Sequence, residues 1–447
     1  MGFRVSHPDH PHSRETVEHS KPERPARTTS AHINPRAKSV PRLPALIIYC
    51  LLMGIAAMLS TPAAWSQATA TSGSNATAMD SLLKDLTVIV GASVTNDSNL
   101  FRRPVLEASE TITSGYLGLR LNKSLGQQQI QLDITKTANR YEKFKYLDFD
   151  ALNYSGAWNW RLGTQFSGKL SASRSESLAP FEDTVGIRRN VRISENQAFD
   201  VDTWIGGGWY LLLGIGQSSQ KSEQNVQNLS RTPDFDSSNR SIGVKYQTRA
   251  GNTLSARRYS TEGEYTNALP GAVNNDYSED LSELSADWKL TATSTLNGRI
   301  GWLERDNKDP TRRDFSGPSS SLNYSWNPGG KLSLGISAAR KISPLQNLTA
   351  SYREDSSLSV APAWRISDKT SAFMRLSYQK SDDKNTLVVL PTGPRSDTTK
   401  IAAMGLDWSA TRKLTINASV ERQQRTSTLA TAGYDATIAR IGASLAF

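Results

Sequence analysis

One hairpin pattern recurs along the chain and limits the folds that are open to it. In its clearest copy, Trp408 precedes a short polar turn, after which apolar residues alternate with polar ones from Leu414 to Val420. Period-two alternation is typical of a strand with one apolar and one polar face. Tyr246 heads a weaker copy, and four further copies in the same register begin at Trp160, Trp288, Trp326 and Trp364. The chain therefore uses many copies of one amphipathic β-hairpin.

The whole region from Leu86 onward divides into alternating segments separated by turn signals. Strands of about ten residues suit tilted segments that cross a bilayer. We predict 18 strands, an even number, with the spans 86–97, 113–123, 128–140, 149–162, 165–177, 197–210, 212–221, 238–248, 253–265, 279–290, 294–305, 317–327, 331–342, 354–366, 370–380, 397–408, 413–425 and 434–447.

The connections between these segments are of two kinds, and the two kinds alternate. Short turns such as 328–330 and 367–369 follow one strand of each pair. Longer polar stretches follow the other, at 178–196, 222–237, 266–278, 306–316, 343–353 and 381–396. Short turns on one side and long loops on the other are typical of a bacterial outer-membrane barrel, with the short turns in the periplasm.

The composition also favours a sheet with a wet inner face. Hydrophobic residues make up only 37% of the chain. Beyond residue 66 no apolar run is long enough to form the core of a soluble domain or a spanning helix. Because every backbone polar group in lipid needs a partner, a membrane sheet must close on itself. We therefore predict an all-β fold, a transmembrane antiparallel β-barrel of about 18 strands, preceded by a cleavable signal peptide.

The N-terminal part of the chain has the composition of a leader. Residues 1–42 are basic and rich in proline, residues 43–59 are apolar, and small residues follow at Ala64 and Ser66. A basic flank, an apolar segment and small residues indicate a secretory signal, and a single membrane anchor is the alternative. The predicted organisation is a leader and signal peptide at 1–66, a periplasmic linker at 67–85 and an outer-membrane β-barrel at 86–447.

Aromatic residues just before the short turns should lie at one level. In barrels such rings form a girdle at the membrane interface, here the periplasmic one. Phe447 closes the last alternating strand and resembles the C-terminal signal for barrel insertion. A propeller with repeats of about 40 residues is the alternative, but the terminal Phe and the turn–loop alternation favour the barrel. The predicted girdle is Trp160, Tyr246, Trp288, Trp326, Trp364 and Trp408.

Charged residues fall on the opposite face of these strands. A charge that faces lipid near the bilayer centre costs about 2–4 kcal/mol, so these side chains should line the lumen. A barrel of this size leaves an aqueous interior unless it is plugged, and a mainly basic lining favours anionic or hydroxyl-rich solutes. The alternative is that the charges form ion pairs that only stiffen the wall. The predicted lumen-lining residues are Arg120, Asp133, Arg161, Lys169, Lys245, Arg257, Arg299, Arg375 and Arg440.

Several classes of chemistry are disfavoured. The one Cys, Cys50, and all five His lie within the leader, so the mature chain lacks a disulfide, a Cys/His metal site and a His-activated nucleophile. Asp133, Asp287 and Asp407 are inward carboxylates, but Asp287 and Asp407 occupy repeat positions, each directly before a girdle Trp. We therefore predict no enzyme activity, no cofactor and no metal. The net charge of +10 falls to +6 without the leader, which is no nucleic-acid signature.

Five stretches, together with Asp407-Trp408, carry a family resemblance. They are 96–102, 146–150, 167–174, 303–306 and 313–318. They resemble the EpsL-type outer-membrane proteins of exosortase-associated exopolysaccharide loci, over most of residues 86–447. The resemblance implies a porin-like barrel in the outer membrane of a Gram-negative bacterium, concerned with exopolysaccharide biosynthesis or export. Implied partners are outer-membrane lipid, exopolysaccharide, other export-locus proteins and the barrel assembly machinery. It implies no catalytic or ligand residues.

Two alternatives to export remain open from the residues alone. One is a general diffusion porin for small solutes. The other is a structural or surface-interaction barrel with a blocked lumen.

The leader gives a direct prediction. Signal peptidase should cut after Ser66, so N-terminal sequencing of protein from isolated outer membranes should begin at Gln67. A mature protein that retains residues 43–59 would instead support the membrane anchor.

Overall fold

A computed structural model describes residues 85–183, 187–223, 234–266, 274–309, 314–344, 350–386 and 393–447. The predicted leader and all but the last residue of the predicted linker lie outside these ranges. Among the described residues, no helix has the length and apolarity needed to span a membrane.

The described chain forms one antiparallel sheet of 18 strands. The strands are β1 (Leu86–Asp97), β2 (Glu110–Leu125), β3 (Gln128–Tyr141), β4 (Phe149–Leu162), β5 (Phe166–Leu178), β6 (Val191–Gly206), β7 (Trp209–Ser222), β8 (Asp234–Gln247), β9 (Thr253–Thr266), β10 (Tyr277–Thr291), β11 (Ser294–Asn307), β12 (Phe315–Trp326), β13 (Leu332–Pro344), β14 (Ala350–Arg365), β15 (Thr370–Thr386), β16 (Ser396–Ser409), β17 (Leu414–Ser427) and β18 (Tyr434–Ala446).

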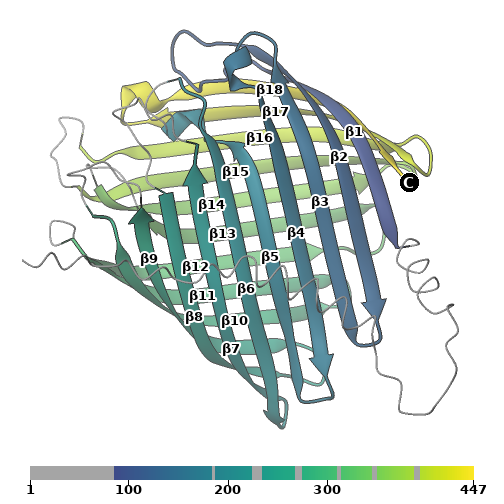
Figure 1. Cartoon of the computed structure of the whole chain (residues 1–447), viewed down its shortest axis with the longest axis vertical. Helices are drawn as coiled ribbons and strands as arrows, with labels where there is room; N and C mark the ends of the chain where they lie inside the picture. The colour runs from purple at the N-terminus through teal and green to yellow at the C-terminus, as the bar shows by residue number, and fades with distance from the viewer. Residues whose placement is uncertain are drawn as a thin grey trace, which may run out of the picture. The chain divides into compact units, whose positions relative to one another are not determined.

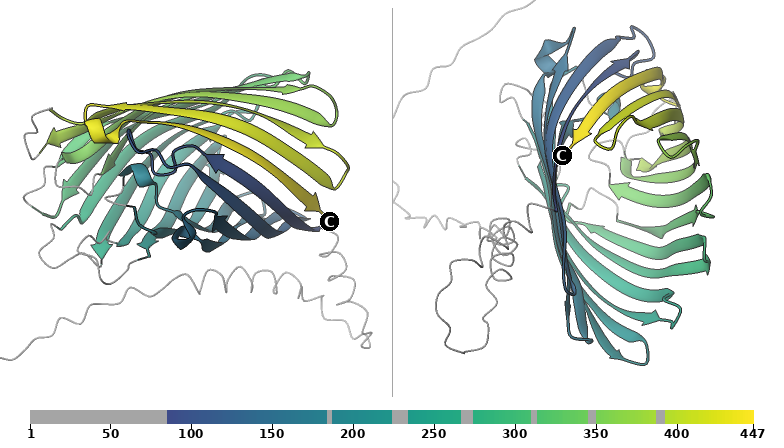
Figure 2. Two further views of the ribbon diagram at one scale, coloured as in Figure 1. Left: turned by 90° about the horizontal axis from the view of Figure 1, so that it is seen from above. Right: turned by 90° about the vertical axis from the view of Figure 1, so that its right-hand side faces the viewer.

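The sheet closes between its first and last strands (Figures 1 and 2). β1 pairs with β2 on one side and with β18 on the other, from Ile89 opposite Ala446 to Asp97 opposite Ile438. Phe447 completes this seam, because its backbone N–H donates to Val88 O at 2.9 Å and its carbonyl accepts from Val88 N at 3.1 Å. Closure leaves no open sheet edge, which confirms the predicted 18-stranded barrel.

Connections of two to five residues alternate strictly with connections of five to twelve residues. All the short ones lie at the end of the barrel where β1 begins and β18 ends. One of them corrects the predicted spans 197–210 and 212–221. β6 ends at Gly206 and β7 begins at Trp209, since Gly206, Gly207 and Gly208 have φ values of 112°, 58° and 89°. Glycine adopts such angles readily, so these three residues turn the chain where alternation alone predicted strand.

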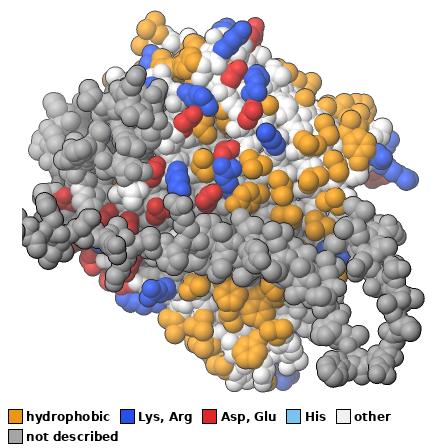
Figure 3. Space-filling view, viewed as in Figure 1, with side chains coloured by type: hydrophobic (Ala, Val, Ile, Leu, Met, Phe, Trp, Pro, Cys, Tyr) orange, Lys and Arg blue, Asp and Glu red, His pale blue; other side chains and the backbone are white. Residues whose placement is uncertain are grey.

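Most strands are also longer than predicted, and the strands have 12 to 17 residues each. β6 begins at Val191 and β15 runs to Thr386, so both extend into stretches that the sequence analysis had assigned to long loops. On β15 the added outward residues include Asp382 and Lys384, whereas the apolar band of the same strand carries Met374 and Leu376. Figure 3 shows hydrophobic side chains gathered nearer the short turns and most charged ones nearer the long loops. Beyond the apolar band, the backbone ladder continues with polar neighbours.

These outer charges form cross-strand pairs that are open to solvent. Arg140 contacts Asp150 at 2.8 Å, Arg258 contacts Asp280 at 3.1 Å, and both pairs are roughly half-exposed. Exposed pairs of this kind contribute at most about 1 kcal/mol each. They therefore mark where lipid contact ends and add little to stability.

All six predicted girdle residues lie within the last four residues of a strand that leads into a short turn. Trp160 packs over Gly168 on β5 and stacks on Phe199 of β6, with ring centroids 6.1 Å apart. Trp209 lies at the same level, 5.0 Å from Tyr246. The sequence analysis missed Trp209 because it follows the misplaced turn.

The contact between Trp160 and Gly168 gives a stability prediction. A Cβ at position 168 would lie 2.5 Å from Trp160 Cζ2 and 2.2 Å from Asp200 O. We expect Gly168→Val to lower the free energy of unfolding by about 1–3 kcal/mol, as measured by urea titration of barrels refolded in lipid vesicles.

Gly115→Val is the matched control, because a Cβ on that strand residue meets nothing within 4 Å. Its expected change is within about 0.5 kcal/mol. Equal destabilisation by both variants would contradict the packing of Trp160 on Gly168.

Candidate functional site: the inner face of the barrel

One ion pair shows which face of the sheet is concave. Arg257 on β9 contacts Asp200 on β6, with Nη2 and Oδ1 3.0 Å apart, although β7 and β8 lie between them. The pair passes over Gly214, where a Cβ would lie 2.6 Å from Asp200 Oδ1 and 3.1 Å from Arg257 Nη2. Side chains separated by two intervening strands meet in this way only on the inside of a curved sheet.

Cross-strand partners carry this assignment round the barrel. Residues opposite each other in an antiparallel pair point to the same face. Asp200 lies opposite Lys169, and Lys169 lies opposite Asn159. Every second residue of a strand shares a face, so the assignment continues through the other strands in turn and returns to Arg257. The structure places on this inner face Arg120, Asp133, Arg161, Lys169, Lys245, Arg257, Arg299, Arg375 and Arg440.

Most of these charges have a partner of opposite sign. Five basic residues contact acids, which supports the alternative of a stiffened wall for those five. The pairs are Arg120–Asp133 at 3.0 Å, Lys245–Asp202, Arg257–Asp200 at 3.0 Å, Arg299–Glu283 at 3.9 Å and Arg375–Glu421 at 3.0 Å.

The remaining three basic residues differ from these. Arg440 Nε donates to Thr95 Oγ1 at 3.0 Å. Arg161 and Lys169 are exposed on the inner face of β4 and β5. Within the described ranges neither has an acid within ion-pair distance.

Two cavities lie along the inner face of β2–β6, and Lys169 lines both. The cavity nearer the short turns has a volume of about 370 Å³, and the other has a volume of about 490 Å³. The first is lined by Arg161, Asp200, Asp202 and neutral residues that include Gln127, Gln129, Asn159 and Ser167. The second is lined by the Arg120–Asp133 pair and by Asn122, Gln131, Ser155, Ser171, Ser173 and Asn196.

The loop at 98–109 packs over the inner face at the long-loop end. The ring of Phe101 lies edge-on to those of Phe144 and Phe181, with ring centroids 4.7 Å and 5.0 Å apart. These three residues belong to three different long connections, which therefore meet there. The loop also reaches across the seam, because Arg102 contacts Asp97 at 2.8 Å and Gln423 on β17 at 3.2 Å. We call residues 98–109 the roof loop. It occupies part of the mouth on the side of β1, β17 and β18.

The sequence analysis used residues 96–102 only for the family resemblance. Arg102 has a φ of 53°, and the buried carboxylate of Glu110 accepts from the backbone N–H of Thr111 and of Phe144, at 2.7 and 2.8 Å. Alternation gives no signal for such contacts, because they join loops.

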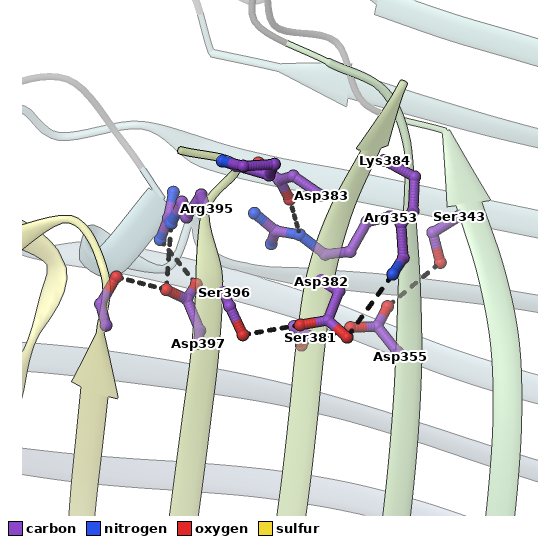
Figure 4. Close-up of polar contacts among 12 residues, drawn as sticks. Ser343, Arg353, Asp355, Ser381, Asp382, Asp383, Lys384, Arg395, Ser396 and Asp397 are labelled. Carbon is purple, nitrogen blue, oxygen red and sulfur yellow. Dashed lines mark hydrogen bonds and ion pairs between the residues drawn. The ribbon is translucent and has the colours of Figure 1, made fainter. Parts of the chain in front are cut away.

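A second group of buried charges lies near the long loops on β14–β17 (Figure 4). Arg353 contacts Asp383 at 2.8 Å, and Asp397 lies between Arg395, at 3.0 Å, and Arg425. Asp383 and Asp397 are almost fully buried. Burying a charge is costly unless it is paired, so this group acts as a set of ties between neighbouring strands.

The three inward carboxylates considered for catalysis lie on separate strands. Asp133 contacts Arg120, Asp287 accepts from Asn297 at 2.6 Å, and Asp407 lies opposite Asn417. Among the residues that the structure describes, no three His, Cys, Asp or Glu side chains are grouped to hold a metal ion.

The profile of a protein family described as "Putative beta-barrel porin 2" matches residues 276–447. The C-terminal part of the barrel is porin-like. A search of curated proteins gives no match.

Solved outer-membrane proteins share low sequence identity with the chain. The outer-membrane protein OpdK from Pseudomonas aeruginosa is 11% identical, with a TM-score of 0.45, over 81% of this chain and 99% of its own. OccK2 (OpdF) from the same organism, solved in complex with glucuronate, is 13% identical, with a TM-score of 0.47 and the same coverage. A BenF-like porin from Pseudomonas fluorescens Pf-5 is 12% identical, with a TM-score of 0.44, over 81% and 98%.

The pair between Arg257 and Asp200 gives the next prediction. Asp200→Asn removes the charge that balances Arg257 and keeps the side-chain shape. We expect the free energy of unfolding to fall by about 1–3 kcal/mol, because a partly buried guanidinium then loses its charged acceptor. Urea titration in vesicles measures this change.

Asp150→Asn is the matched control, since its partner Arg140 is half-exposed on the outer face. Its expected cost is at most about 1 kcal/mol. If both variants lose the same free energy of unfolding, the pair between Arg257 and Asp200 has no special role in stability.

Proposed function

We propose that the chain forms a porin-like channel in the outer membrane that passes hydroxyl-rich and anionic solutes and serves exopolysaccharide export. The observation that carries the proposal is the contrast between the two faces of the closed sheet. The outer face bears exposed apolar side chains such as Leu284, Ile300 and Met404. The inner face bears amides, hydroxyls and charges, which suit water and polar solutes.

The proposed surroundings follow from the same contrast. Outer-membrane lipid covers the apolar band, and the aromatic girdle lies at the periplasmic interface. Phe447 is proposed as the residue read by the barrel assembly machinery, and its backbone bonds to Val88 place it at the closing seam. The export role, with exopolysaccharide and other export-locus proteins as partners, is supported by the family resemblance. Nothing in the proposal requires a cofactor or nucleic acid.

Two other functions are each favoured by one observation. Paired charges line much of the inner wall, which suits a general diffusion porin with little preference among small solutes. The roof loop contacts inward-facing residues of the seam, as Arg102 does with Gln423, which suits a barrel with a blocked lumen.

A conductance measurement separates the three functions. Purified protein in planar bilayers should open channels, because the proposed lumen is aqueous. Fragments of the host's exopolysaccharide should block the current. Channels that these fragments do not block would favour the general porin, and a lack of channels would favour the blocked barrel. A sample denatured by heat before reconstitution controls for contaminating porins.

A genetic experiment tests export separately. Deleting the coding sequence in frame should lower the amount of exopolysaccharide at the cell surface, and expression from a plasmid should restore it. Normal exopolysaccharide in the deletion strain would sink the export role without affecting the channel.

A further inference from the structure

Two bases on the inner wall of β4 and β5, Arg161 and Lys169, have no ion-pair partner among the described residues. The two acids that line the smaller cavity are already paired, Asp200 with Arg257 at 3.0 Å and Asp202 with Lys245. Arg161 and Lys169 line the same cavity. Asp200 lies opposite Lys169 in the strand register, but its carboxylate contacts Arg257, which leaves both bases of the cavity outside any ion pair among the described residues.

The register brings the two bases together. Arg161 lies opposite Ser167, and Lys169 lies opposite Asn159, so the bases are diagonal neighbours on adjacent strands. Diagonal neighbours in an antiparallel pair have backbones about 7–8 Å apart, within reach of one another for long side chains. A guanidinium and an ammonium at this spacing can both donate to one carboxylate, and charge-assisted bonds of this kind are strong.

The remaining lining offers hydrogen bonds without charge. Gln127, Gln129, Asn159 and Ser167 lie round the smaller cavity. Amides both donate and accept, and hydroxyls do the same. Sugar hydroxyls also do both, so this lining complements a saccharide ring.

The dimensions fit a small carbohydrate. Volumes of about 370 and 490 Å³ fall within the range of small-molecule sites. Lys169 lines both cavities, so a solute longer than one ring would extend from the first into the second, where Ser171, Ser173 and Asn196 continue the polar lining.

We propose that Arg161 and Lys169 form a binding site for acidic sugars at the short-turn end of the lumen. The carboxylate of a uronate lies between the two bases, and its ring hydroxyls bond to the amides and hydroxyls of the cavity. This inference deepens the proposed channel function and rests on it. Because this is the end where both termini of the barrel lie, the site selects solutes at the proposed periplasmic mouth.

The test uses the purified full-length barrel and a pair of probes. D-glucuronate and D-glucose have the same ring size and differ mainly in the carboxylate. Isothermal titration calorimetry should show that glucuronate binds. The dissociation constant of glucose should be at least about tenfold higher than that of glucuronate. The double variant Arg161→Gln/Lys169→Gln should weaken glucuronate binding by about tenfold or more, because two charge-assisted bonds are lost. It should leave the glucose signal unchanged.

Lys289→Gln/Arg365→Gln is the matched control. It removes one Lys and one Arg that also face inward at the short-turn end, on β10 and β14, away from both cavities. The control should bind glucuronate as the wild type does. The proposal is overturned if the first double variant binds like the wild type, or if both double variants lose affinity equally. Equal loss would mean that only the overall charge of the lumen matters. Each variant is folded if its band on an SDS gel migrates more slowly after the sample is boiled than before.

Conductance recorded in parallel keeps the site and the channel function distinguishable. Open channels without glucuronate binding would refute the site and leave the channel. Glucuronate binding without channels would refute the channel and leave the site. Arg161→Lys adds a further check, because it keeps the charge and should retain most of the affinity.

Discussion

The rule that every backbone polar group in lipid must have a partner underlies the whole structure. An open sheet of these strands would expose two unpaired edges to hydrocarbon, at several kcal/mol for each unsatisfied group. The seam between β1 and β18 removes both edges, and Phe447 adds the last two backbone bonds. Once the sheet is closed, the side chains of each strand divide into a lipid-facing and a water-facing set. The repeated hairpin is the sequence counterpart of this division.

The charged side chains of the inner wall then lie close together in a confined space. Ties such as Arg257–Asp200 and the pairs around Asp397 join strands and cancel charge where they occur. Arg161 and Lys169 form no ion pair among the described residues, and they are diagonal neighbours that line one polar cavity. Their placement in this cavity is better explained by a ligand than by stiffening of the wall.

Local periodicity was enough to predict the barrel, the number of strands and the placement of six aromatic residues near strand ends. Trp408 and its counterparts mark those ends because six of the hairpins carry an aromatic residue just before the short turn. The turn at Gly207 was missed because glycine does not interrupt the apolar–polar pattern of the sequence, although its backbone can bend there. The ion-pair partners were also beyond prediction. Arg257 and Asp200 are 57 positions apart, and only curvature brings them together.

Contacts made by loops were the hardest to foresee. Phe101 contacts Phe144 and Phe181, and each of the three residues lies in a different loop. No sequence periodicity relates their positions. The extra length of strands such as β15 was hidden for a related reason. Lys380, Asp382 and Lys384 face outward above the apolar band and resemble loop residues in composition, although they belong to the ladder.

The roof loop has a consequence for the order of assembly. It follows the first strand of the barrel, yet Ser98 N–H donates to Thr437 O at 3.0 Å and Asn99 Nδ2 donates to Asp435 O at 2.9 Å, both near the start of the last strand. These bonds cannot form until the final hairpin arrives. Until then the roof loop would be held only by earlier parts of the chain, such as Phe144 and Phe181, and its attachment across the seam would be a late event of maturation.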